Sequence, residues 1–223
     1  QATTAVRVVG AKDMRVLFVQ GGLTWDYKFM RLAVSGDPTI QISALSRAAS
    51  GSTFMQSDAN DASLSGGFPS TIQQLASYCV IVLSNLTLGD LTDARQDLLA
   101  QFCRELGGGV LLIGGATTFD ASWQGSRLEQ LLTVKFSASS RRPTGGQLFR
   151  LRVTEEALSH PVFQISETAD HRAAWDRLPA FSDYAPVDSV KPGARIWAVA
   201  DTPGESAPAP VLIASQRYGA GLT

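Results

Sequence analysis

The sequence predicts an α/β fold in which a mostly parallel sheet is flanked by helices. Four predicted strands alternate with amphipathic helical segments over the first 134 residues, which is typical of buried parallel strands connected by helices. After about residue 135 this alternation is lost, and apolar residues recur with a period of two. The change of pattern predicts an antiparallel extension in the C-terminal third.

The elements of the first half are predicted by local patterns. Short apolar or alternating runs predict strands at 14–19, 39–45, 78–83 and 110–113. Thr24 and Thr92 are N-cap residues that precede helices, and Gly107 ends the second of these helices. In the first helix, Trp25, Phe29, Leu32 and Ala33 recur at helical spacing; shorter helical segments are expected at 71–77 and 126–132, and a long surface loop at 48–70.

The second half predicts strands at 147–153, 195–200 and 211–216, with a helical turn at 155–159. Residues 217–223 predict a turn that leads into a strand beyond the printed sequence, so we expect a domain excised from a longer protein. Together the elements predict one flavodoxin-like domain over 1–223, a three-layer sandwich with a mostly parallel central sheet. Its parallel β/α core is expected over 1–134, and the antiparallel extension and last core strands over 135–223.

The composition excludes several classes of protein. Lys and Arg number 19 and Asp and Glu number 20, a net charge of -1. This balance predicts no nucleic-acid partner and no contact of this segment with an anionic membrane. The apolar runs are too short to cross a bilayer, so we expect a soluble domain. The two cysteines cannot form a disulfide framework.

Residues that follow three predicted strands form the candidate binding site. In an open parallel sheet, ligands bind beyond the carboxyl ends of the strands, and glycines there let backbone N–H groups approach a ligand. A purely structural interpretation also stays open, in which the glycines only permit tight turns and Asp26 only complements the helix dipole. The candidate ligand-binding residues are Gly21, Gly22, Asp26, Ser84, Asn85, Gly114, Gly115, Thr117 and Thr118.

Little in the sequence indicates a phosphate-binding loop, a metal site or a reactive cysteine. Gly109 and Gly114 have the spacing of a phosphate-binding loop, but Gly115-Ala116 stands where that loop needs Lys and Ser or Thr. The two histidines, His160 and His171, lack a neighbouring ligand cluster, so no metal and no cofactor is expected. Cys79 and Cys103 occupy apolar positions and are interpreted as buried small hydrophobes.

Several motifs resemble the class I glutamine amidotransferase-like domains of large bacterial membrane-associated proteins. The resemblance begins at Arg15-Val-Leu-Phe-Val-Gln-Gly-Gly and Trp25-Asp-Tyr-Lys-Phe-Met-Arg, and it continues at Leu106-Gly-Gly-Gly-Val-Leu-Leu-Ile-Gly-Gly. The second half, with His160-Pro-Val-Phe and Pro210-Val-Leu-Ile-Ala-Ser-Gln-Arg-Tyr-Gly-Ala-Gly, is also similar to the trehalose-utilisation-type branch of that superfamily.

The resemblance implies where a catalytic group would stand. The superfamily's enzymes use a Cys-His-Glu triad, with the Cys on a sharp turn after a Gly-rich strand. In this chain that turn, the elbow, corresponds to Gly114-Gly115-Ala116 and carries no Cys, Ser or Thr. His160-Pro161 matches the structural His-Pro segment of the trehalose-utilisation-type branch, so we assign His160 a structural role and name no catalytic residue.

The hypothesis favoured by these observations is a non-catalytic amidotransferase-like domain that acts as a binding or scaffolding module. Its expected partners are the other domains of a larger, membrane-anchored bacterial parent and a small-molecule ligand. Two alternatives stay open. One is a glutamine amidotransferase or related hydrolase with an unconventional nucleophile, and the other is a small-molecule or sugar-binding domain that uses the same crevice.

Overall fold

The computed structural model describes residues 13–22, 24–47, 54–56, 64–115, 118–136, 148–201 and 209–223. Within these residues, a seven-stranded sheet has the order β11-β12-β5-β4-β1-β2-β3. Its strands are β1 (Met14–Gln20), β2 (Ile40–Arg47), β3 (Phe54–Gln56), β4 (Val80–Ser84), β5 (Gly109–Ile113), β11 (Arg217–Tyr218) and β12 (Gly221–Leu222).

The central strands of this sheet are parallel. β2, β1, β4, β5 and β12 pair in parallel, while the edge strands β3 and β11 are antiparallel to their neighbours. Numbered along the chain, the five parallel strands lie in the order 2-1-3-4-5, which is the flavodoxin-like order. The mixed α/β fold with a mostly parallel central sheet, predicted from the sequence, is therefore confirmed.

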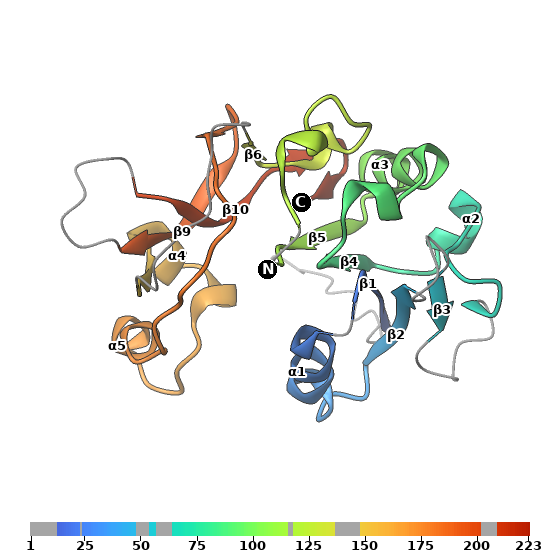
Figure 1. The fold of residues 1–223 in the computed structure, drawn as a ribbon. Coiled ribbons are helices and arrows are strands. Elements are labelled where there is room, and N and C mark those ends of the chain that lie inside the picture. Colours follow the sequence, from blue (N-terminus) through green and yellow to red (C-terminus); the bar gives the residue numbers. More distant parts are fainter. Residues whose placement is uncertain are drawn as a thin grey trace, which may run out of the picture.

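Helices cover the two faces of the sheet. Side chains of β1 alternate between the faces: Val16 and Phe18 pack on the side of α1, whereas Leu17 and Val19 join the core under α2 and α3. Figure 1 shows α1 on one side of the sheet and α3 on the other. These helices are α1 (Trp25–Val34), α2 (Ile72–Leu75) and α3 (Asp93–Leu106).

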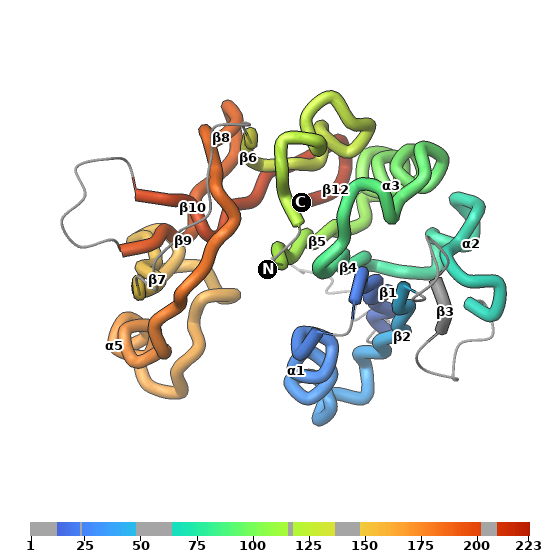
Figure 2. Tube along the Cα trace, in the orientation of Figure 1, coloured from blue at the N-terminus to red at the C-terminus, as the bar shows by residue number. Residues whose placement is uncertain are grey.

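A smaller antiparallel unit follows the parallel core, as the sequence predicts. Its three-stranded sheet has the order β10-β9-β7 and packs a second apolar core around Phe163 and Trp197. From β10 the chain returns to β12, which lies beside β5 (Figure 2). The remaining elements are β6 (Val134–Lys135), β7 (Arg150–Val153), α4 (Glu155–Leu158), α5 (His171–Asp176), β8 (Ser189–Val190), β9 (Arg195–Asp201), β10 (Val211–Ser215) and the 3-10 turns η2 (Leu88–Asp90), η3 (Ala121–Trp123), η4 (Glu129–Leu131) and η5 (Pro161–Phe163).

Three predicted segments differ from the structure. The expected loop at 48–70 contains β3, although 48–53 and 57–63 lie outside the described residues. The helix expected at 126–132 is only the 3-10 turn η4; Leu128, Leu131 and Leu132, which share one face at helical spacing, are buried as a helix would bury them, but the helix itself does not form. Residues 217–223, predicted as a turn, contain the two short strands β11 and β12, which form a hairpin, and β12 pairs with β5.

The apolar residues that predicted α1 do not face the core. Trp25, Phe29 and Leu32 are 67%, 60% and 65% exposed, and Ala33 is exposed as well. The helix instead packs Tyr27 and Met30 against the sheet. The spacing therefore predicted the helix correctly, although its large apolar residues are not the ones that pack against the sheet.

This arrangement predicts a contrast between two phenylalanines in helices. Phe102 of α3 is 1% exposed, so Phe102→Ala should lower the free energy of unfolding by about 3–5 kcal/mol. Phe29→Ala in α1 should lower it by less than about 1 kcal/mol, because the ring is mostly in solvent. Urea unfolding of both variants measures the difference, and equal losses would show that α1 buries its aromatic face.

Candidate functional site

The predicted site residues lie at the carboxyl ends of three neighbouring parallel strands. Gly21 follows β1, Asn85 follows β4 and Gly114 follows β5. Gly21 N–H donates to the Ser84 carbonyl at 3.0 Å, and Asn85 N–H donates to the Ile113 carbonyl at 3.1 Å. The junction of β1 and β4 is also where the strand order reverses, the usual place for a ligand in such sheets.

Asn85 occupies the space among the glycines that follow these strands. Its backbone is left-handed, with φ of 49°. A Cβ added to Gly21 would lie 2.2 Å from the Asn85 carbonyl oxygen, and one added to Gly115 would lie 1.9 Å from Asn85 Oδ1. Both distances are far shorter than any real contact, so these two glycines are required for packing against Asn85. Gly22 has more room, because its added Cβ would lie 3.6 Å from Asn85 Nδ2.

Asp26 and Ser84 are joined by a hydrogen bond between helix and sheet. The Ser84 hydroxyl donates to Asp26 Oδ2 at 2.7 Å. Ser84 is completely buried, so its oxygen cannot reach a substrate and the pair acts as a lock between α1 and β4. Asp26 thus has a specific partner besides the helix dipole. Thr24 occupies the N-cap position of α1, although its side chain makes no capping hydrogen bond.

The remaining predicted residues lie on the β5 side of the site. Thr118 is buried, and its N–H donates to the Gly115 carbonyl at 3.3 Å. Thr117 lies outside the described residues. Gly114 and Gly115 also line a cavity of about 530 Å³ between β5 and the C-terminal segments. The other described members of the predicted site do not line this cavity.

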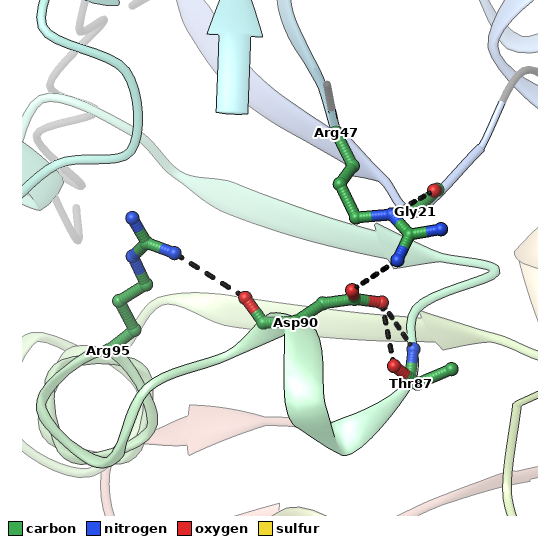
Figure 3. A network of polar contacts seen from close by, with 5 residues as sticks. All are labelled: Gly21, Arg47, Thr87, Asp90 and Arg95. Carbon is green, nitrogen blue, oxygen red and sulfur yellow. Dashed lines mark hydrogen bonds and ion pairs between the residues drawn. The ribbon is translucent and has the colours of Figure 1, made fainter. Parts of the chain in front are cut away.

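Sequence reasoning missed a polar network at the same sheet edge (Figure 3). Asp90 is 4% exposed; its carboxylate pairs with Arg47 at 2.9 Å and accepts hydrogen bonds from the backbone N–H and hydroxyl of Thr87. Arg47 Nε also donates to the Gly21 carbonyl at 2.8 Å, and Arg95 donates to the Asp90 carbonyl at 3.4 Å. The Thr87-x-x-Asp90 spacing of a capping box was the available signal. The network fixes the loop after β4 against the ends of β1 and β2.

His160 has the contacts of a structural residue. Its Nδ1 accepts a hydrogen bond from the Val162 N–H at 3.3 Å, which caps η5. Its ring lies 5.1 Å from the ring of Trp197, in the core of the antiparallel unit. His171 Nδ1 similarly accepts from the Ser166 N–H at 3.4 Å. Both imidazoles therefore serve local turns.

The two cysteines have different environments. Cys103 of α3 is buried as predicted, and burial raises the pKa of its thiol to about 11. The prediction that Cys79 is buried is wrong, because this residue precedes β4 at the amino end of the sheet and is exposed. Neither cysteine lies at the elbow. In the described part of the chain, no group of three or more His, Cys, Asp or Glu side chains is placed to hold a metal ion.

No helix among the described residues has the length and apolar character needed to cross a membrane.

Comparison with known proteins supports the fold. No protein-family model matches the chain, and no curated protein matches it. Among solved structures, the chain is similar to the crystal structure of a ThuA-like protein from Bacteroides uniformis ATCC 8492. The TM-score is 0.51 at 16% sequence identity, covering 89% of this chain and 72% of that chain. The likeness is consistent with the amidotransferase-like fold that the sequence resembles.

The lock between Asp26 and Ser84 can be tested with a double-mutant cycle. Asp26→Asn and Ser84→Ala should each lower the free energy of unfolding, and the double variant should lose less than the sum. We expect a coupling energy of about 1–3 kcal/mol, since the hydrogen bond joins a hydroxyl to a charged group. Chemical unfolding of the four proteins gives this value. Additive losses would mean that Asp26 complements only the helix dipole.

The cysteine environments predict selective thiol labelling. At about pH 8, a disulfide reagent that releases a coloured thiolate should modify one thiol rapidly in the folded domain. Cys79→Ser should abolish this fast phase, while Cys103→Ser should leave it unchanged, because the buried Cys103 thiol stays protonated. A fast phase that disappears with Cys103→Ser would contradict the described burial.

Proposed function

We propose that this chain is a non-catalytic amidotransferase-like domain that acts as a binding or scaffolding module. The observation that carries the proposal is the close packing of Gly115 against Asn85. An added Cβ at Gly115 would lie 1.9 Å from Asn85 Oδ1 and 2.6 Å from Asn85 Cγ. Because any nucleophilic side chain begins with a Cβ, this position of the elbow has no room for one.

The neighbouring position, Gly114, is crowded to a lesser degree, because a small shift of one side chain would admit a Cβ. A Cβ there would lie 3.0 Å from the ring of Phe119. Of the nearby hydroxyl groups, that of Ser84 is buried and bonded to Asp26. His160 bonds to its own turn and packs on Trp197. These contacts favour a domain without the catalytic machinery of glutaminases over an enzyme with an unconventional nucleophile.

The proposed setting is a larger, membrane-associated bacterial protein. Its support is the resemblance of Arg15-Val-Leu-Phe-Val-Gln-Gly-Gly and the later motifs to amidotransferase-like domains of such proteins. In that setting, the domain would contribute a surface on which some charged groups pair with one another. Arg47 with Asp90, and Arg127 with Asp93 and Asp97, are examples of such pairs.

The proposal predicts that the purified domain does not release ammonia from glutamine above the rate without protein. A class I glutamine amidotransferase assayed in parallel is the positive control. The Cys79→Ser/Cys103→Ser double variant shows whether any signal depends on a thiol. Ammonia release by the domain would overturn the proposal, and release that persists in the double variant would reveal a different nucleophile.

A further inference from the structure

The cavity beside Gly114–Gly115 is built from segments that are far apart in the sequence. Its walls come from β5, from residues 119–136, from the loop at 183–187 and from β10. It therefore lies where the parallel core meets the C-terminal segments. Its volume of about 530 Å³ is within the range of roughly 300–1,000 Å³ that is usual for small-molecule sites.

One face of β5 is open toward this cavity. β5 is an internal strand, between β12 and β4, and internal parallel strands are normally covered on both faces. Leu111 of β5 nevertheless is 46% exposed and lines the cavity. The cause is the position of α1, whose Tyr27 and Met30 pack mainly on residues of β1, β2 and β4. An apolar wall thus stays accessible to a ligand.

The described residues of the lining are mostly apolar, and none of them carries a positive charge. Most of the side chains are aliphatic or aromatic, and the neutral polar ones are the hydroxyls of Thr133, Tyr184 and Thr223. Asp183 is the only charged side chain among the described lining residues, which include no Lys, Arg or His. An anionic group in this cavity would lose its hydration without gaining a cationic partner, and this is costly.

We infer that the cavity is a binding site for a neutral, largely apolar small molecule that carries an uncharged polar group such as a hydroxyl. This deepens the proposed function, on which it rests, by naming the class of ligand. The apolar part of the ligand lies against Leu111 and the aliphatic side chains of β10. The hydroxyl oxygens of Thr133 and Thr223 can accept a neutral hydrogen bond from the ligand, while the Thr223 hydroxyl itself donates to the Gln216 carbonyl at 3.5 Å. The carboxylate of an amino acid such as glutamine finds no counter-charge among the described lining residues.

The test uses two probes of the same chain length, 1-decanol and decanoate, that compete with the neutral dye Nile red for the whole domain. Decanol should displace the dye at least about tenfold more strongly than decanoate, because the carboxylate pays for desolvation without a partner. This comparison needs no substitution. Equal displacement, stronger displacement by decanoate, or no saturable binding of decanol would overturn the inference.

A substitution then locates the site. Leu111→Lys places a cation in the cavity wall, so it should weaken decanol binding and strengthen decanoate binding, which reverses the preference. Leu32→Lys on the exposed face of α1 is the matched control and should change neither. If Leu32→Lys alters binding and Leu111→Lys does not, the probes bind α1 and the inference is wrong. Ammonia release from glutamine, measured separately, would instead overturn the proposed function.

Discussion

The packing of Asn85 between two glycines is the constraint on which the carboxyl edge of the sheet depends. Asn85 leaves β4 in a left-handed conformation, which places its carbonyl against Gly21 and its side chain against Gly115. Its N–H holds the Ile113 carbonyl at the end of β5. Asn85 thereby sets the spacing between the ends of β1, β4 and β5. The chain at Gly21 and at Gly115 comes so close to Asn85 that neither residue has room for a Cβ.

This constraint explains why the edge has the topology of a ligand site while Gly115 of the elbow packs directly against Asn85. Several of the polar groups gathered there bond to one another within the fold: Ser84 bonds to Asp26, and Asp90 bonds to Arg47 and Thr87. In an enzyme, glycines at this edge would leave space around a nucleophile. In this chain, Gly21 and Gly115 leave space for Asn85. A cavity lies to one side, along β5, where most of the described lining residues are apolar. This distribution of groups is the basis of our proposal that the domain binds a partner or ligand.

The sequence predicted the parts of the fold that depend on local patterns. As expected, α3 begins after the N-cap Thr92 and ends before the C-cap Gly107, because N-caps and left-handed C-caps are set by a few adjacent residues. The convergence of Gly21, Ser84, Asn85 and Gly115 was also predictable, because parallel strands end at the same edge. Whether these residues bind a ligand stays a prediction.

Features that depend on distant packing were not predictable. The spacing of the apolar residues along α1 is compatible with more than one buried face. Only the position of the sheet shows that Tyr27 and Met30 face inward, while Trp25 and Phe29 do not. The ion pair of Arg47 with Asp90 joins residues 43 positions apart. The cavity requires β10 to approach β5 across about a hundred residues of chain, and no local pattern near Leu111 indicates it.

The most direct test of the central claim is the cost of a Cβ at Gly115 with and without the Asn85 side chain. Gly115→Ala should lower the free energy of unfolding by about 1–3 kcal/mol, as overpacking does. In the Asn85→Gly background, where the side chain is gone and glycine accepts the φ of 49°, the same change should cost much less. Gly22→Ala, whose Cβ makes an ordinary contact, is the control. An equal cost of Gly115→Ala in both backgrounds would contradict the account.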